Sequence, residues 1–318
     1  MSIKHNRAEA SPETPTDRGP GRAGKKSHDS PLIRPMEGLD DQDGAALLAQ
    51  GNHFGQGHGH DHENDHDHDH APCQNRRVLV LRPHSGVSGD IMVTGLAQVS
   101  GLGQKDLDGL LADLGLGALR GRVFLEPRAL GGITGFGLRV ELEPEREHRT
   151  LNDIKDFLNK ANLTDRARAL ALSTFAILAQ AEGRVHGLPP DQVHFHEVGA
   201  IDSLLDIGLA AAIFDRLNPD LFVCGPLPIC DGTIECAHGL LPSPAPAVSI
   251  LLEGVMVRGI NSVGETVTPT GLALLKSFGA KFGPWPLLTV ERQALVFGTR
   301  VLPNVANGAL FALGQTPR

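Results

Sequence analysis

The strongest constraint in this sequence is an abrupt change of composition near residue 75. Residues 1–75 are rich in Pro, Gly, Asp, Ser and His and contain few large apolar side chains. Such a segment cannot bury enough apolar surface to offset the conformational entropy lost on folding. We therefore predict a disordered tail over residues 1–75, followed by one folded domain over residues 76–318.

Strand and helix patterns alternate through the folded part. Short apolar runs predict strands at residues 78–81, 123–130, 137–143, 221–224 and 287–297, with a hairpin turn at Gly131-Gly132. Apolar periodicity and capping residues predict helices at residues 91–99, 104–114, 150–158, 201–217, 247–252 and 268–278, and one running from Asn162 or Thr164 to Arg184. The expected fold class is α/β, a mixed sheet with flanking helices.

Composition excludes several classes of function. The net charge is −8, and the chain has one Trp and no Tyr, so neither electrostatic nor stacking contacts favour nucleic acid. The longest apolar stretch, residues 207–214, is too short to span a bilayer, and no secretory signal is visible. We expect a cytoplasmic protein with reduced cysteines, in which Cys224 and Cys230 are buried small hydrophobes.

A histidine-rich tract lies inside the tail, at residues 52–70. It holds seven His in nineteen residues, interleaved with four Asp and one Glu and with no Lys or Arg. Neutral imidazole binds Ni²⁺, Zn²⁺ and Cu²⁺ well, and the carboxylates attract cations. The tract therefore predicts metal binding suited to loading or storage, by His58, His60, His62, His66, His68 and His70, although a solvated polar segment is the alternative.

A glycine loop follows the first predicted strand. Residues 85–90 read SGVSGD and precede a helix, an arrangement that lets backbone N–H groups and glycines meet an anion. Ser85, Gly86, Ser88 and Gly89 are therefore candidate phosphate-binding residues, and Asp90 is a candidate catalytic residue. A tight turn capped by Ser, with Asp90 stabilising the helix start, explains the same residues without a ligand.

The segment HFHE at residues 194–197 precedes the most apolar helix. In an extended segment His194 and His196 share one face and Glu197 lies on the other, so the two imidazoles are candidate metal ligands. Asp202 and Asp206 are one helical turn apart, and Asp206 is the only charge between Ser203 and Phe214. Glu197, Asp202 and Asp206 are thus candidate catalytic carboxylates, unless the buried Asp206 is satisfied by ordinary partners.

Two later motifs add candidates. Cys236 and His238 are a thiol and an imidazole two residues apart, which suits a soft metal pair or a nucleophile with its base. Thr268 and Thr270 begin a helix and form a second candidate anion site, with Glu265 just before it. Packing of the Cys, a turn at the His and simple capping by the threonines are the structural alternatives.

Taken in order, these motifs resemble a known family. The strings SGVSGD at residues 85–90, VHFHEVGAIDS at 193–203, CAHG at 236–239, PSPAPA at 242–247 and TPTG at 268–271, with HRTLNDI at 148–154 and FGTR at 297–300, resemble the nickel-insertion (LarC) family of the lactate racemase system. The resemblance covers residues 78–314. It implies insertion of Ni²⁺ into a pyridinium bis-thiocarboxylic acid mononucleotide, which yields the nickel-pincer nucleotide cofactor.

The resemblance also implies partners and departures. The family's C-terminal domain binds CTP with Mg²⁺ or Mn²⁺, and this chain stops near where that domain would begin. Either another polypeptide supplies this CTP-binding part, in which case we expect a nickel chelatase of the lyase class, or the chemistry has been lost; the self-association state is left open. Arg82-Pro83-His84 stands where the family has an acidic residue and a Cys, so a role there is lost or passes to His84.

Three functions stay open on the sequence. The first is nickel insertion into the mononucleotide, with the tail collecting Ni²⁺ for His194 and His196. The second is a nickel metallochaperone or storage protein without catalysis. The third is a metal-dependent hydrolase that uses the same histidines and an Asp.

Overall fold

The computed structural model describes residues 75–142, 149–195, 201–236 and 239–317. The tail and its histidine tract lie outside these residues, so the predictions made for them are not addressed by the fold. Among the described helices, none has the length and apolarity needed to cross a membrane.

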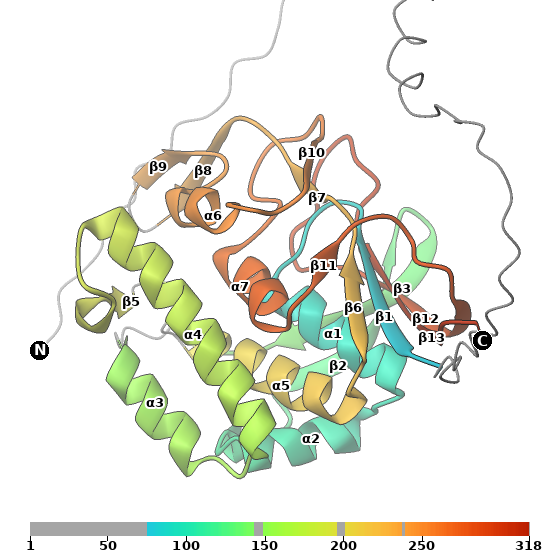
Figure 1. Ribbon diagram of the computed structural model, residues 1–318, viewed down its shortest axis with the longest axis horizontal. Coiled ribbons are helices and arrows are strands. Elements are labelled where there is room, and N and C mark those ends of the chain that lie inside the picture. The colour runs from blue at the N-terminus through green and yellow to red at the C-terminus, as the bar shows by residue number, and fades with distance from the viewer. Residues whose placement is uncertain (1–74, 143–148, 196–200, 237–238, 318) are drawn as a thin grey trace, which may run out of the picture. The chain divides into compact units, whose positions relative to one another are not determined.

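Within the described residues, seven strands form one mixed sheet in the order β11-β6-β1-β13-β12-β3-β2 (Figure 1). β1 pairs in parallel with β6 and antiparallel with β13, which confirms the predicted mixed α/β class. The strands of this sheet are β1 (Arg77–Pro83), β2 (Val123–Leu130), β3 (Ile133–Val140), β6 (Leu221–Cys224), β11 (Lys281–Phe282), β12 (Thr289–Val296) and β13 (Ala309–Gln315).

Three small two-stranded sheets accompany the main one. They pair β4 with β5, β7 with β10, and β8 with β9. Their strands are β4 (Arg149–Thr150), β5 (His194–Phe195), β7 (Leu227–Ile229), β8 (Thr233–Cys236), β9 (Gly239–Pro242) and β10 (Val257–Gly259).

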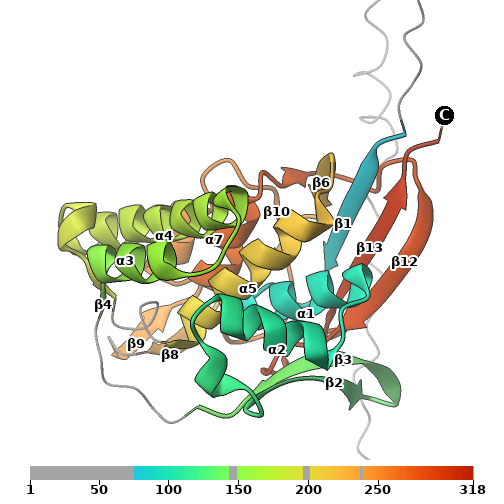
Figure 2. The same cartoon turned by 90° about the horizontal axis from the view of Figure 1, so that it is seen from below.

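Helices lie on one side of the strands β1, β12 and β13, as Figure 2 shows, and α1 packs directly on β12 and β13. The helices are α1 (Gly89–Ser100), α2 (Gln104–Asp113), α3 (Leu151–Lys160), α4 (Asp165–His186), α5 (Ile201–Leu217), α6 (Pro246–Leu251) and α7 (Pro269–Ser277), with short 3₁₀ turns at Gly117–Leu119 and Pro190–Gln192. α5 contacts both α1 and α4, which explains its almost uniformly apolar sequence. A helix covered on all sides must be apolar all round.

Burial of β1 on both faces explains why residues 78–81 are continuously apolar. Leu79 and Leu81 join the core beneath the helices, while Val78 and Val80 pack on the other face with Val223 and Ala312. A strand buried on both faces loses the usual alternation of polar and apolar residues. This strand ends at Pro83 and delivers the glycine loop to the helical side of the sheet.

One central strand was not predicted from the sequence. The last predicted strand covers residues 287–297, but β13 follows that strand and lies between β12 and β1. Its sequence ALFALGQ contains Ala and Gly, which are depleted in strands, so local propensity gives little signal. The predicted strand at 137–143 is shifted to 133–140, whereas the turn at Gly131-Gly132 is confirmed, with φ values of 58° and 80°.

Gly95 offers a test of how tightly α1 packs on β13. A Cβ at this position would lie 2.2 Å from ring carbons of the buried Phe311. We expect Gly95→Ala to lower the free energy of unfolding by about 1–3 kcal/mol, because overpacking outweighs the better helix propensity of Ala. The measurement is urea denaturation followed by circular dichroism.

Gly109 on α2 provides the matched control. Nothing lies within 4 Å of a Cβ built there, so Gly109→Ala should raise the free energy of unfolding by about 0.5–1 kcal/mol. Equal effects of the two substitutions would contradict the packing described for α1.

Candidate functional site

Backbone hydrogen bonds join the loop after β1 to the loop before α7. Val87 N–H donates to the Thr266 carbonyl at 3.0 Å, and Thr268 N–H donates to the Val87 carbonyl at 3.0 Å. Gly86 has φ +151°, and a Cβ there would lie 1.7 Å from the Thr266 carbonyl oxygen. Only glycine permits this approach, so the loop holds the starts of α1 and α7 side by side.

A cavity of about 880 Å³ opens beside these two helix starts. Its volume falls within the range of about 300–1,000 Å³ that is typical of small-molecule sites. The cavity brings together many of the predicted residues: Ser85, Gly86, Ser88, Asp90, Asp202, Asp206, Glu265 and Thr268. Thr270 and Gly89 are not among the described residues that line it, although Gly89 lies against the lining residue Asp206.

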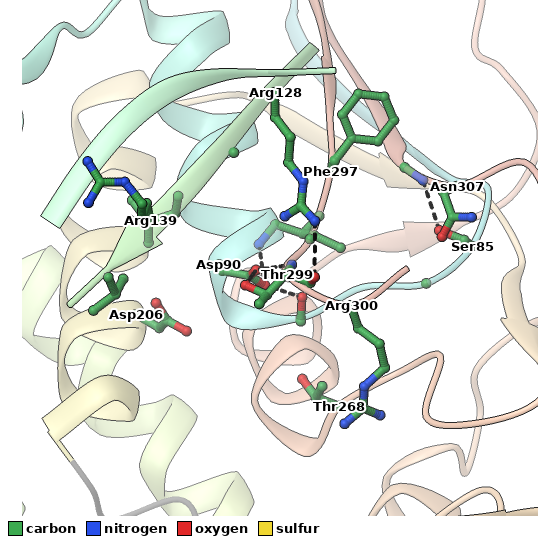
Figure 3. A pocket seen from close by; sticks show the side chains of 18 of the residues that line it. Ser85, Asp90, Arg128, Arg139, Asp206, Thr268, Phe297, Thr299, Arg300 and Asn307 are labelled. Atoms are coloured by element: carbon green, nitrogen blue, oxygen red, sulfur yellow. Dashed lines mark hydrogen bonds between the residues drawn. The ribbon is translucent and has the colours of Figure 1, made fainter. Parts of the chain in front are cut away.

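Both oxygens of the Asp90 carboxylate accept hydrogen bonds at the edge of the cavity (Figure 3). One oxygen accepts from the Ser88 hydroxyl and from Ile91 N–H at 2.9 Å. The other accepts from the Thr299 N–H at 2.9 Å and the Thr299 hydroxyl at 3.1 Å. Asp90 therefore ties the loop after β12 to the start of α1, and its catalytic role stays a prediction.

Asp206 lies against the start of α1. A Cβ on Gly89 would stand 2.2 Å from Asp206 Oδ2, so glycine leaves the space that this carboxylate occupies. Burial above all, then the nearby Asp90 and Asp202, holds the pKa of Asp206 well above its ordinary value of 3.8. Because the Asp90 carboxylate and the Asp206 carboxyl group occupy this helix start, a phosphate bound there would meet the charge of Asp90, which argues against the anion site predicted at Gly86 and Gly89.

Three arginines line the cavity, and none was singled out from the sequence. Arg139 is paired with Glu126 at 3.0 Å and with Glu141, and it covers the Phe124 ring. Arg128 donates to the Thr299 carbonyl at 3.1 Å. Arg300 lies 3.6 Å from Glu265. Only the FGTR string of the resemblance pointed at one of them, because hairpin residues such as Arg128 and Arg139 carry no motif of their own.

Thr268 acts as a helix cap, as predicted. Its hydroxyl accepts from Gly271 N–H at 3.1 Å, with Pro269 at the first helical position. Of the two residues predicted to begin α4, Thr164 is the one whose side chain caps the helix. Because the Thr268 hydroxyl is engaged by the helix and also faces the cavity, its capping role and a ligand role are compatible.

The predicted metal ligands are mostly beyond the described residues. His196, Glu197, His238 and the histidines of the tract lie outside them, while His194 and Cys236 are described only as backbone of β5 and β8. Among the residues that are described, no three His, Cys, Asp or Glu side chains form a group that could hold a metal ion. The metal assignments therefore stay predictions.

Cys224, Cys230 and His84 are not among the described residues that line the cavity. Cys224 and Cys230 are buried and unpaired with each other, as predicted, and burial raises the pKa of the Cys224 thiol to about 12. Partial burial, then the charges of Arg258 and Arg82, lowers the pKa of His84. A lowered pKa favours neutral imidazole, the form that ligates metals, but a role for His84 stays a prediction.

Comparison with known proteins gives a consistent family. Residues 79–316 match the family model described as nickel insertion protein. The chain is 32% identical over 231 residues to the pyridinium-3,5-bisthiocarboxylic acid mononucleotide nickel insertion protein of Staphylococcus epidermidis, covering 72% of this chain and 58% of that protein. It is 33% identical over 255 residues to the protein of the same name in Geobacillus kaustophilus, covering 76% and 61%.

A protein of Geotalea daltonii that is also named for nickel insertion is 36% identical over 240 residues, covering 76% of this chain and 61% of that protein. The chain thus spans about three fifths of the length of these curated relatives. No solved structure matches the chain significantly.

The environment of Asp206 generates a pH-dependent prediction. Since its pKa is raised in the folded state, the native protein holds a proton that the unfolded chain releases above about pH 3.8. The free energy of unfolding should therefore fall as the pH rises from that value through the folded-state pKa. Asp206→Asn should remove this dependence and stabilise the neutral-pH protein by about 1.4 kcal/mol per unit of raised pKa.

The measurement is urea denaturation at a series of pH values between 4 and 8. Asp156→Asn, at an exposed position on α3, is the control and should leave the pH dependence as it is. A parallel pH profile for Asp206→Asn and the unaltered protein would contradict the description of Asp206.

Proposed function

The chain belongs to the nickel insertion protein family, and we propose that it binds a pyridinium-3,5-bisthiocarboxylic acid mononucleotide in the cavity and inserts nickel into it. The observation that carries the proposal is a cavity lined by both carboxylates and arginines. Asp202 and Asp206 line it from α5, while arginines line it from the β2–β3 hairpin and the loop after β12, where Glu126 and Glu265 accompany them. Such a site suits a ligand that is anionic and must also meet a cation.

The two substrates fit a cavity with both kinds of charge. The mononucleotide named for the relatives carries a phosphate and two thiocarboxylic acid groups. Guanidinium groups bind phosphate and carboxylate-type groups through charge-assisted hydrogen bonds. Ni²⁺ would approach from the carboxylate side and be taken up by the sulfur atoms, since soft donors hold it well in a square-planar site. The protein's part is to position both and to remove water from the ion.

The proposed nickel ligands stand close along the chain to this side of the cavity. β5 ends at Phe195 and α5 begins at Ile201, so His196 is six residues from Asp202. We retain His194 and His196, with Glu197, as the groups that hand nickel to the mononucleotide, and Cys236 and His238 as a further soft pair.

Two parts of the proposal concern partners. The histidines of residues 52–70 would collect Ni²⁺ and raise its concentration near the site. CTP and Mg²⁺ or Mn²⁺ would take part only with a CTP-binding partner subunit. The cellular location expected for such a protein is the cytoplasm.

Nickel insertion can be tested directly. The full chain is incubated with Ni²⁺, the mononucleotide, CTP and Mg²⁺, with and without a separately prepared CTP-binding subunit, and the nucleotide is analysed by mass spectrometry. We expect a nickel-containing nucleotide in the complete mixture and none without the chain. A nucleotide that stays free of nickel in every combination, while a full-length relative converts it, would exclude the proposed activity.

Deleting residues 52–70 separates collection of the metal from chemistry. We expect most of the bound Ni²⁺ to be lost, as measured by equilibrium dialysis, because the tract carries seven of the chain's 15 histidines. Affinity for the mononucleotide should stay unchanged, since the cavity lies in the folded part. Unchanged nickel stoichiometry would contradict the role of the tract, and nickel binding without any turnover would favour storage.

A further inference from the structure

The segment between β12 and β13 carries a motif to which no role has yet been given, FGTR at residues 297–300. Phe297 N–H donates to the Phe136 carbonyl at 2.8 Å. Gly298 packs so closely on α1 that a Cβ would lie 3.0 Å from Ile91 Cδ1. Thr299 is held by Asp90 on one side and by Arg128 on the other. The backbone is therefore fixed up to the residue before Arg300.

Arg300 itself is loosely held. Its nearest carboxylate is Glu265, at 3.6 Å, which is longer than a hydrogen bond, and its side chain is 59% exposed. An ion pair of this kind contributes little free energy, so its guanidinium can change partner at low cost. By contrast, Arg139 has two glutamates and Arg128 is engaged by a backbone carbonyl.

Arg300 and the carboxyl group of Asp206 on α5 lie on different sides of the cavity. In Figure 3, Arg300 and Asp206 lie on opposite sides of Asp90, and Thr268 is on the side of Arg300. The contact with Glu265 also places the guanidinium near the start of α7, three residues further along the chain. An anionic group bound by Arg300 would thus lie on the other side of Asp90 from Asp206, and the positive end of α7 would favour it.

We propose that Arg300 binds the phosphate of the mononucleotide, so that the ring with its thiocarboxylic acid groups points toward Asp202 and Asp206. This inference rests on the proposed function for the identity of the ligand. A guanidinium offers paired N–H donors that match phosphate oxygens, and release from Glu265 makes them available. The pinned backbone at Thr299 limits the entropy that Arg300 loses on binding.

Other locations for the phosphate are less favourable. The start of α1 is faced by the carboxylates of Asp90 and Asp206. Arg139 is already neutralised by Glu126 and Glu141. Arg128 is held by the Thr299 carbonyl at 3.1 Å, whereas Arg300 approaches Glu265 only to 3.6 Å, so Arg300 can turn to a ligand with the smaller loss of contact.

A comparison of two ligands tests the assignment. The mononucleotide and the nucleoside made from it by phosphatase are titrated into the full chain by calorimetry, in a buffer free of phosphate. We expect Arg300→Ala to weaken binding of the mononucleotide by about 10- to 100-fold, the effect of losing a charged hydrogen-bonding partner. Binding of the nucleoside should change less than about twofold, because it has no phosphate for Arg300 to hold.

Two further variants complete the experiment. Arg300→Lys should give an intermediate loss for the mononucleotide, since it keeps the charge but not the paired donors. Arg292→Ala is the matched control, because Arg292 donates to the Val99 carbonyl and is not among the described residues that line the cavity. It should leave both affinities unchanged.

The outcomes separate the inference from the function on which it rests. If Arg300→Ala binds the mononucleotide as the unaltered protein does, or weakens both ligands equally, Arg300 does not hold the phosphate and the inference is overturned. If the unaltered protein binds neither ligand, the proposed function fails as well. A loss confined to the phosphorylated ligand supports the inference.

Discussion

The close approach of two backbone loops, at Gly86 and Thr266, is the constraint on which the site depends. Without a side chain at residue 86, the loop after β1 can lie directly on the Thr266 carbonyl and exchange hydrogen bonds through Val87. This contact sets the start of α1 beside the start of α7. Because the alternative is a buried backbone without partners, the contact is also strongly favoured once the sheet has formed.

The position of α1 then determines where the carboxylates stand. Asp90 lies in its first turn and accepts hydrogen bonds from Ser88, Ile91 and Thr299 with its two oxygens, which joins the loop after β12 to this helix. Asp206 reaches the same place from α5 only because Gly89 leaves room for it. Burial and two neighbouring carboxylates make the charged form of Asp206 unfavourable. A nearby cation would stabilise that charged form.

The opposite charge is provided by elements distant in sequence. The β2–β3 hairpin and the loop after β12 bring arginines to the same cavity, and Arg128 joins the two by its bond to Thr299. A nickel insertion protein has to bring together an anionic nucleotide and a divalent cation, which attract each other and also attract wrong partners. In the proposed function, the arginines would hold the nucleotide and the carboxylates of α5 would hold the cation until the metal is transferred.

The sequence alone determined the local features of this protein. Apolar periodicity located α5 at its observed bounds and β6 likewise, and Thr150, Thr164 and Thr268 marked helix starts, because caps and periodicity act within a few residues. The motifs also led to the carboxylates and the glycine loop of the cavity. Only the tertiary structure decided that β13 lies between β1 and β12, that Asp90 is satisfied by Thr299, and that three arginines complete the cavity. Those facts join residues 209 positions apart in the case of Asp90 and Thr299, and further apart in the pairing of β1 with β13. Such contacts are selected by the packing of the whole sheet and leave no local pattern in the chain.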